Sequence, residues 1–231
     1  MSDVIEIKPI GYIKTPFPSK FGIPRQSGIL NSIEGTIVFE REFRDINAFR
    51  ELEKFSHIWL IWGFSHNDGK SWSPSVRPPK LGGNKRVGVF ASRSPFRPNP
   101  LGLSCVQLKK IEISKNNGPI LHICGADLAD NTPIYDIKPY VAYSDSHPDA
   151  VSGFSVNSDD ARIDVEISDD AKTDIPESDL EKVFEILAQD PRPSYKKGSD
   201  RVYALEFSDY EVFFVYDSEK IIIKKIEKTR S

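Results

Sequence analysis

Alternation of hydrophobic and polar positions, which is typical of half-buried strands, recurs through the first 150 residues. Between Gly35 and Glu40, Ile37 and Phe39 alternate with Thr36 and Val38. Comparable apolar runs, bounded by Gly, Pro, Asn and Asp, predict further strands over 4–15, 55–64, 86–91, 103–113, 119–128 and 136–143. The run at 55–64 (FSHIWLIWGF) is nearly all apolar, which predicts a strand buried on both faces. Only one short helix, capped by Asp45, interrupts the strands, so the pattern favours a sandwich or barrel over βαβ units.

The pattern changes after residue 154. Residues 155–176 are strongly acidic and predict a linker or edge segment, which includes a possible strand over 162–168. Ser178 and Glu181 then form a capping-box pattern before a helix, which carries Leu180, Val183 and Leu187 on one face. Strands follow over 201–207, 210–216 and 220–227. We therefore predict a β domain over 1–154 and a small C-terminal helix-plus-meander domain over 177–231.

Composition fits such a globular chain. Its 231 residues are 39% hydrophobic and 28% charged, which is enough apolar material for a core and excludes a wholly disordered protein. Cys105 and Cys124 do not form a CxxC pair, so we expect two small buried residues and no zinc site. The sequence shows no signal-peptide pattern and no run long enough for a membrane span, which predicts a cytoplasmic protein.

Positive charge is concentrated in one stretch, although the net charge of the chain is −3. The window from Lys70 to Lys110 contains nine Lys and Arg residues and no Asp or Glu. Clustered positive charge of this kind binds phosphates in a salt-dependent manner. A solvated basic face without a partner is the equally open alternative.

Two polar segments are candidates for a site. In RSPFRPNPLGLS (93–104) three prolines stiffen a loop that presents Arg93, Arg97 and Asn99, either to a ligand or as a structural crossover. In DLADNTPIYDIKPY (127–140) the acids Asp127, Asp130 and Asp136 suit a metal, ribose hydroxyls, an amino group or a sulfonium, or only turn chemistry. No GxGxxG follows a strand, so a Rossmann-type cofactor site is not predicted.

Several long segments, in order, resemble the TrmO/YaeB (TsaA-like) family of tRNA methyltransferases. The matching segments are IGYIKTPF, KFGIPRQSG, FSHIWLI, VRPPKLGGNKRVGVFASRSPFRPNPLGLS, DLADNTPIYDIKPY, YSDSHPDA and QDPRPSYKKG. The resemblance implies a single-sheet antiparallel β-barrel, assembly as a homodimer, and S-adenosylmethionine as cofactor. It also implies N6-methylation of threonylcarbamoyladenosine beside the tRNA anticodon.

Carried over motif by motif, the resemblance implies a set of cofactor-binding residues. They are Gln26, Ser27, Gly28, Ser65, His66, Arg93, Leu103, Gly125, Ala126 and Asp127. This sequence departs from the family pattern at Ser27, where Pro is usual, at Asn131, where Gly is usual, and over 63–65. The last departure leaves the choice between Ser65 and His66 open.

A ureido nitrogen becomes a good nucleophile only when it loses its proton, so a base or a carbonyl-stabilising group is required. We assign these roles to Asp130 and Arg97, with His66 and Arg93 as alternatives, and predict that no metal is needed. Predicted tRNA contacts are Lys80, Lys85, Arg86, Arg192 and Lys196. Two other functions stay open: a methyltransferase of the same fold with another substrate, and a non-catalytic RNA-binding or regulatory module.

Overall fold

A computed structural model describes residues 4–64, 71–155, 162–171, 173, 175–192, 201–217 and 219–229. Contacts divide the chain into two compact units. The barrel unit contains Met1–Thr15, Gln26–Ser73 and Pro95–Ser146, and the C-terminal unit contains Pro16–Arg25, Pro74–Ser94 and His147–Ser231. The domain limits at residues 154 and 177 concern which segments fold independently, and they stay a prediction.

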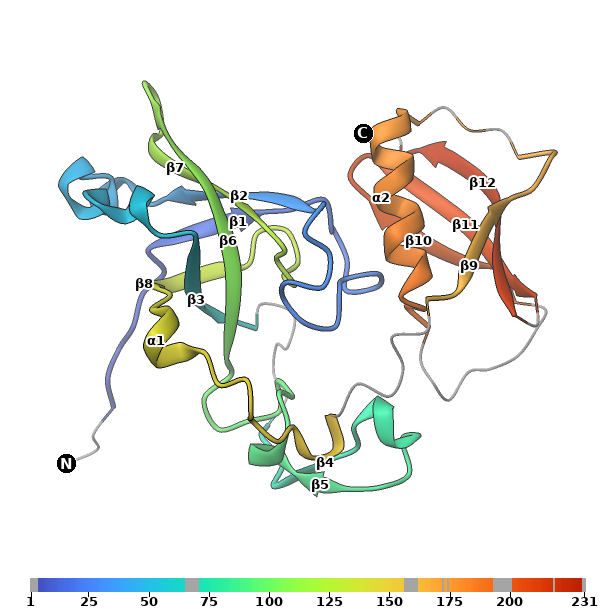
Figure 1. The fold of residues 1–231 in the computed structure, drawn as a ribbon, viewed down its shortest axis with the longest axis horizontal. Helices are drawn as coiled ribbons and strands as arrows, with labels where there is room; N and C mark the ends of the chain where they lie inside the picture. Colours follow the sequence, from blue (N-terminus) through green and yellow to red (C-terminus); the bar gives the residue numbers. More distant parts are fainter. Residues whose placement is uncertain are drawn as a thin grey trace. The chain divides into compact units, whose positions relative to one another are not determined.

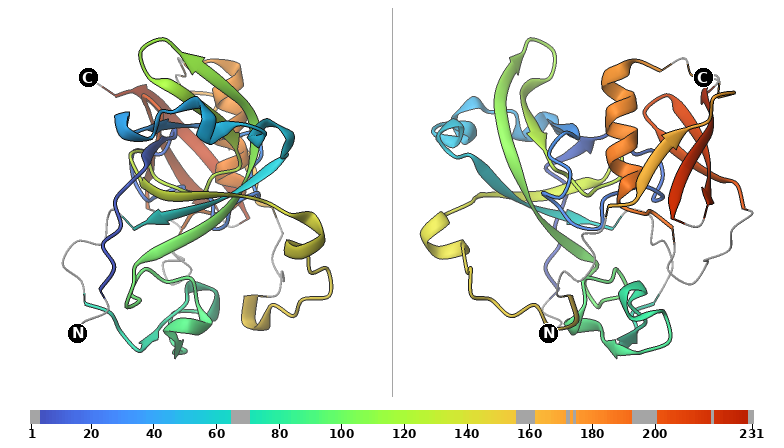
Figure 2. Two further views of the ribbon diagram at one scale, coloured as in Figure 1. Left: turned by 90° about the vertical axis from the view of Figure 1, so that its left-hand side faces the viewer. Right: turned by 45° about the vertical axis from the view of Figure 1, so that its right-hand side comes forward.

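Six antiparallel strands of the barrel unit close into one barrel in the order β1-β2-β7-β6-β3-β8 (Figures 1 and 2). Their bounds are β1 Gly11–Lys14, β2 Glu34–Phe39, β3 His57–Gly63, β6 Leu101–Ser114, β7 Gly118–Cys124 and β8 Pro133–Pro139. The mainly-β barrel predicted from the sequence is confirmed. Closure joins β1 to β8, which removes the open edges of the sheet.

The barrel interior explains the pattern of β3. Ile58, Leu60 and Trp62 point into the core, whereas the residues between them are mostly half-buried on the outer face. The prediction that this strand is buried on both faces is wrong, because a closed barrel has only one interior face. β1 is also shorter than the predicted strand over 4–15, since pairing with β2 begins only after Pro9 and ends before Pro16.

Short helical turns connect the barrel strands. The 3-10 turns η1 Arg41–Phe43, η2 Ile46–Phe49 and η3 Leu52–Lys54 lie between β2 and β3, and the helix α1 Ala142–Asp145 follows the last barrel strand, β8. The Asp45 carboxylate accepts a hydrogen bond from the Asn47 N–H (2.9 Å), which confirms Asp45 as a cap. The capped element is a 3-10 turn and not the α-helix that the spacing suggested.

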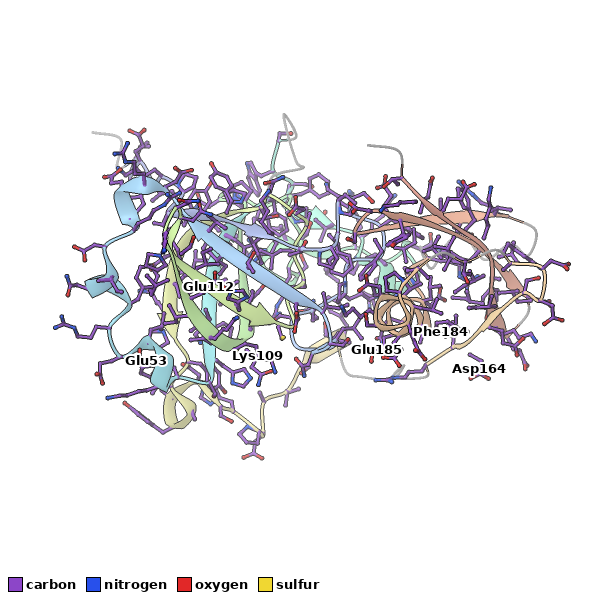
Figure 3. The ribbon with its side chains drawn as sticks, turned by 90° about the horizontal axis from the view of Figure 1, so that it is seen from above. Glu53, Lys109, Glu112, Asp164, Phe184 and Glu185 are labelled. Atoms are coloured by element: carbon purple, nitrogen blue, oxygen red, sulfur yellow. The ribbon has the colours of Figure 1, made fainter. Side chains whose placement is uncertain are left out.

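The C-terminal unit is a four-stranded sheet with one helix along it (Figures 1 and 2). Its elements are β9 Asp164–Ile167, α2 Glu177–Ala188, β10 Tyr203–Phe207, β11 Tyr210–Asp217 and β12 Lys220–Lys228. β9 pairs in parallel with β12, which confirms the strand predicted within the acidic segment. The predicted capping box is wrong: Pro176 precedes the helix and Ser178 lies inside its first turn. Figure 3 looks along α2, from which Phe184 and Glu185 project in different directions.

The early segment 16–25 belongs to the core of this unit. Phe17 is fully buried with its ring edge-on to Phe207. The Phe21 ring stacks with the rings of Tyr203 and Phe214 at centroid distances of 6.4 and 6.3 Å. The Ser208 N–H also donates to the Pro16 carbonyl (2.7 Å). Residues close to the N-terminus therefore complete a unit formed mainly by the last third of the chain.

Before β6 begins at Leu101, the basic window contributes only short elements. They are β4 Ser75–Val76, η4 Pro79–Leu81, β5 Val87–Gly88 and η5 Val89–Ala91, and η6 Gly153–Ser155 follows later in the chain. The strand predicted over 86–91 is therefore limited to two residues before a 3-10 turn. None of the described helices is long and apolar enough to cross a membrane.

Candidate active site

The loop at residues 26–28 is fastened to one end of the barrel. The Gly28 N–H donates to the Gly125 carbonyl (2.8 Å), just beyond the end of β7. The Ser27 hydroxyl accepts a hydrogen bond from the Cys105 N–H of β6 (3.2 Å). These contacts bring together two segments that the resemblance assigned to the cofactor, 26–28 and 125–127.

Two glycines permit this approach. Gly28 and Gly125 have φ values of +77° and +80°, a backbone conformation that residues other than glycine adopt only at a cost in free energy. A Cβ on Gly125 would lie 2.8 Å from the Asn31 Oδ1 and 3.3 Å from the Gly28 Cα. The space beside Gly28 is open instead. The loop at 26–28 and the turn at Gly125 therefore pack backbone against backbone, and space remains beside Gly28.

The third predicted cofactor segment lies on the same edge. β7 ends at Cys124, opposite Gln107, so residues 101–106 of β6 extend beyond it. Backbone groups alternate in direction along a strand, so Leu103 faces the same edge as Cys105, which bonds to Ser27. The Leu103 side chain is 54% exposed on the outer face of the barrel.

A buried hydrogen-bond chain orients Asp127 at this edge. The Trp62 indole N–H donates to the Ser104 hydroxyl (2.9 Å), which donates to the Asp127 Oδ1 (2.5 Å). Ser104 is 1% exposed and Trp62 is part of the barrel core, whereas Asp127 is half-buried. The carboxylate is therefore held at the border between core and solvent. No separate pattern indicated Ser104 in advance, because its position inside the barrel depends on closure of the sheet.

These residues fit S-adenosylmethionine, which supplies an electrophilic methyl group when bound. Backbone at Gly28 and Gly125 offers close approach without side chains. The Asp127 carboxylate suits ribose hydroxyls or a positive group, and Leu103 offers an apolar contact. Ala126 is buried beneath them.

Asp130 is occupied by its own turn. Its Oδ1 accepts from the Thr15 N–H (3.1 Å), its Oδ2 accepts from the Asn131 amide (2.9 Å), and Lys14 lies 3.7 Å away. Asn131 has a φ of +60°, which explains why the family favours glycine there. These contacts are the hydrogen bonds of a tight turn, which was one of the alternatives that the sequence left open. A role for Asp130 in proton transfer stays a prediction.

The proline-rich elbow is anchored at both ends. The Ser73 N–H donates to the Phe96 carbonyl (3.0 Å), and the Phe64 N–H donates to the Pro100 carbonyl (3.1 Å). Arg97 is half-buried and Arg93 is exposed, and each interacts with other groups of the protein. Ser65, His66 and Lys196 lie outside the described residues, as does the side chain of Lys80.

The predicted tRNA contacts differ in exposure. Lys85 and Arg86 are exposed. Arg192 is only 5% exposed: its guanidinium bonds to both Asp190 oxygens (2.6 and 2.8 Å) and lies 3.4 Å from the Tyr216 ring centroid. The hydrogen bonds that Arg192 donates to the Asp190 carboxylate raise the pKa of Arg192 above its usual range. Arg192 therefore has a structural role here, and we leave it out of the proposed tRNA surface.

The end of the basic window is partly neutralised on β6. A register shift between Leu108 and Lys110 leaves Lys109 and Lys110 both exposed. Glu112 then lies 3.9 Å from Lys110 and 2.8 Å from His122; Figure 3 labels Lys109 and Glu112 on this strand. Within the described ranges, no three His, Cys, Asp or Glu side chains are grouped to hold a metal ion.

The chain matches the tRNA-methyltransferase O N-terminal domain over residues 12–146 and the TrmO C-terminal domain over residues 160–229. The chain belongs to the TrmO family. It is 39% identical to a tRNA (adenine(37)-N6)-methyltransferase of Escherichia coli K12 over 217 residues, or 90% of this chain and 91% of that protein. It is 38% identical to a putative S-adenosylmethionine-dependent methyltransferase of Pseudomonas aeruginosa, with 94% of each chain covered. A crystal structure of TrmO from Pseudomonas aeruginosa superposes with a TM-score of 0.78 at 31% identity, covering 97% of this chain and 98% of that one.

TrmO membership confirms the family and the enzyme class predicted from the sequence. The individual site residues remain predictions that rest on the geometry above.

Proposed function

We propose that this TrmO-family chain transfers the methyl group of S-adenosylmethionine to N6 of threonylcarbamoyladenosine, beside the anticodon of tRNA. The observation that carries the proposal is the convergence of three segments on one barrel edge: the 26–28 loop, Leu103 of β6 and the 125–127 turn. The relatives named as tRNA (adenine(37)-N6)-methyltransferases support adenine N6 as the acceptor.

Positioning of the two reactants supplies much of the rate enhancement of methyl transfer. Methyl transfer requires the attacking nitrogen in line with the methyl–sulfur bond, and holding both reactants removes most of the entropic cost. The Trp62–Ser104–Asp127 chain fixes the Asp127 carboxylate in advance, so the cofactor does not have to order it. Arg97, on the anchored elbow, is assigned to the ureido carbonyl, where it stabilises negative charge while Asp130, the assigned base, takes the N6 proton.

The phosphates of tRNA bind the basic window, with Lys80, Lys85 and Arg86 as the assigned contacts. The enzyme acts in the cytoplasm as a homodimer. Light scattering at micromolar concentration tests the assembly: a mass near the 26.1 kDa of one chain contradicts the dimer.

Transfer of labelled methyl groups tests the function directly. Label from S-adenosylmethionine should enter tRNA that carries threonylcarbamoyladenosine and should not enter the same tRNA without that modification. Label in another nucleotide would instead indicate a same-fold methyltransferase with a different substrate. RNA binding without transfer would indicate a non-catalytic module.

A variant pair tests the cofactor site within this assay. Asp127→Asn should weaken S-adenosylmethionine binding in calorimetry about tenfold, since a carboxylate accepts stronger hydrogen bonds than an amide. Asp136→Asn is the matched control, because that carboxylate accepts from the Ile137 N–H at a more exposed position. Equal affinities in the two variants remove Asp127 from the site.

A further inference from the structure

A cavity of about 530 Å³ opens on the outer face of the barrel, beyond the edge that holds the proposed cofactor residues. Its walls come from the ends of three barrel strands and from the N-terminal segment, and include Ile7, Phe64, Asn99, Pro100, Leu101 and Tyr135. The volume lies within the range of small-molecule sites. All of its walls belong to the barrel unit.

The cavity shares one face of the barrel with Leu103. Trp62 points inward, so its neighbours Ile61 and Gly63 lie on the outer face. Leu103 pairs with Ile61 and Leu101 pairs with Gly63, which places both leucines on that face, about 7 Å apart along β6. A molecule in the cavity would therefore adjoin a group held at Leu103.

A glycine shapes the aromatic wall. A Cβ on Gly63 would lie 2.6 Å from the Tyr135 ring, so only glycine allows this ring to lie over β3. The elbow wall is equally fixed, because the Phe64 N–H holds the Pro100 carbonyl and the Leu101 N–H donates to the Asn99 carbonyl (2.7 Å). The cavity is thus formed before any ligand arrives.

The polar group at the rim is the Asn99 carboxamide. It is exposed, and no described residue donates to it or accepts from it. A carboxamide presents an N–H donor, which matches the N7 acceptor of adenine and leaves N6 free to receive the methyl group. The Tyr135 ring adds a face on which a base can stack, whereas the Phe64 ring packs against Trp62.

We propose that this cavity receives the target adenine, turned out of the anticodon loop, with Tyr135 stacking on the base and Asn99 contacting its polar edge. The proposal rests on the proposed function for the identity of the RNA. Methyl transfer places the acceptor base next to the cofactor, and enzymes that modify bases take them out of the stack into such pockets. Tyr135 and Asn99 then determine which base is accepted, whereas the basic window binds any tRNA backbone.

Base-dependent binding tests the cavity without catalysis. An anticodon stem-loop RNA with the target adenosine should bind the wild-type protein about 5- to 150-fold more tightly than the same RNA with an abasic site. Tyr135→Leu and Asn99→Ala should each lose most of this preference while S-adenosylmethionine affinity stays within about twofold of wild type. Tyr143→Leu, at a 95% exposed tyrosine outside the cavity, should keep it.

Outcomes for the cavity and for the enzyme are separable. An adenine preference that survives in Tyr135→Leu and Asn99→Ala overturns the cavity proposal, even if the wild-type protein methylates tRNA. A preference lost in both variants, in a wild-type protein that transfers no methyl group, supports the cavity and overturns the proposed function. If the variants lose cofactor affinity in parallel, the cavity belongs to S-adenosylmethionine and the adenine proposal is wrong.

Discussion

The Ser104 hydroxyl joins the barrel core to the proposed cofactor edge. It accepts from the Trp62 indole and donates to the Asp127 carboxylate, and it has almost no exposure to solvent. A buried polar group of this kind stabilises the fold only while both partners remain in place. One residue therefore affects stability and cofactor binding together.

Ser104→Ala should lower the free energy of unfolding by about 1–3 kcal/mol, because the Trp62 N–H loses its acceptor in a buried site. Urea denaturation measures the change. The control is Ser114→Ala, since that hydroxyl only accepts from the Asn117 N–H in an exposed turn, and we expect a change below about 0.5 kcal/mol there. Equal losses in the two variants contradict the role of Ser104.

The two thiols should react slowly in the folded protein. Burial raises the pKa of Cys105, with a further contribution from Asp145, and burial also raises the pKa of Cys124. A raised pKa lowers the thiolate fraction near neutral pH, and the thiolate is the reactive form. Reaction with a thiol reagent at pH 7.5 should be much faster in urea than in buffer, and the native rate should rise with pH. Equal rates in both solutions contradict burial of these thiols.

At the scale of elements, the extension of β6 beyond β7 creates the candidate site. The freed edge of β6 receives Ser27, and the turn after β7 receives Gly28. The loop then lies between two strands that are adjacent elsewhere in the barrel. Strand length, and not only strand order, determines where the loop can bind.

Gly125→Ala should destabilise this junction more than Gly28→Ala. Both residues have positive φ, so both variants carry a backbone cost of about 1–2 kcal/mol. Only at Gly125 does the new methyl group also meet Asn31 and the Gly28 backbone. Thermal unfolding should separate the variants, and S-adenosylmethionine affinity should fall further in Gly125→Ala. A larger effect at Gly28 contradicts the close packing at Gly125.

The local sequence pattern predicted where the strands lie better than it predicted which of their residues are buried. Alternation of apolar and polar residues located β2, which contains Ile37 and Phe39, because successive side chains of a half-buried strand point to opposite faces. It could not show that β3 has one half-exposed face or that Arg192 is buried on Tyr216, since both depend on contacts between distant residues. Residue chemistry indicated the polar segments 93–104 and 127–140 as candidates for a site, whereas the other cofactor contacts were predicted only through the family resemblance. The cavity at Tyr135 depends on Gly63 of another strand, which no local signal connects to it.

At the scale of the molecule, the chain has a net charge of −3 but contains one basic window, which is the proposed binding surface for an anionic partner. Arg192 is paired with Asp190, and Lys110 lies near Glu112. Lys85 and Arg86 are exposed and lie outside the proposed cofactor segments. They are therefore the residues at which phosphate binding can be tested without disturbing the cofactor.

Replacing Lys85 and Arg86 with Glu should raise the KM for tRNA strongly and reduce the slope of log affinity against log salt by about 1 per lost phosphate contact. S-adenosylmethionine affinity should stay close to wild type. The control is the double variant Lys224→Glu and Lys228→Glu, which makes the same charge change at exposed positions of β12. If both double variants raise the KM equally, net charge and not the basic window controls tRNA binding.

The chain path connects the C-terminal unit directly to the proposed cofactor loop. Segment 16–25 is held in that unit by Phe21, by Gly22 close against Leu205, and by Arg25, which donates to the Asp190 carbonyl (3.1 Å). The next residue, Gln26, begins the proposed cofactor loop. Anchoring one end of a loop lowers the entropy that a ligand must remove to order it.

Phe21→Ala should therefore weaken S-adenosylmethionine binding about tenfold, or about 1.4 kcal/mol, although Phe21 is not among the proposed cofactor contacts. Phe184→Ala is the matched control, because it removes a half-buried ring from α2 of the same unit, whereas Phe21 belongs to the anchored segment itself (Figure 3). Calorimetry on both variants, after circular dichroism confirms folding, separates anchoring from general loss of stability. A tenfold loss confined to Phe21→Ala supports the anchor, since the two rings belong to one unit and differ in whether they hold the loop. Equal affinities in both variants would show that the barrel alone orders residues 26–28.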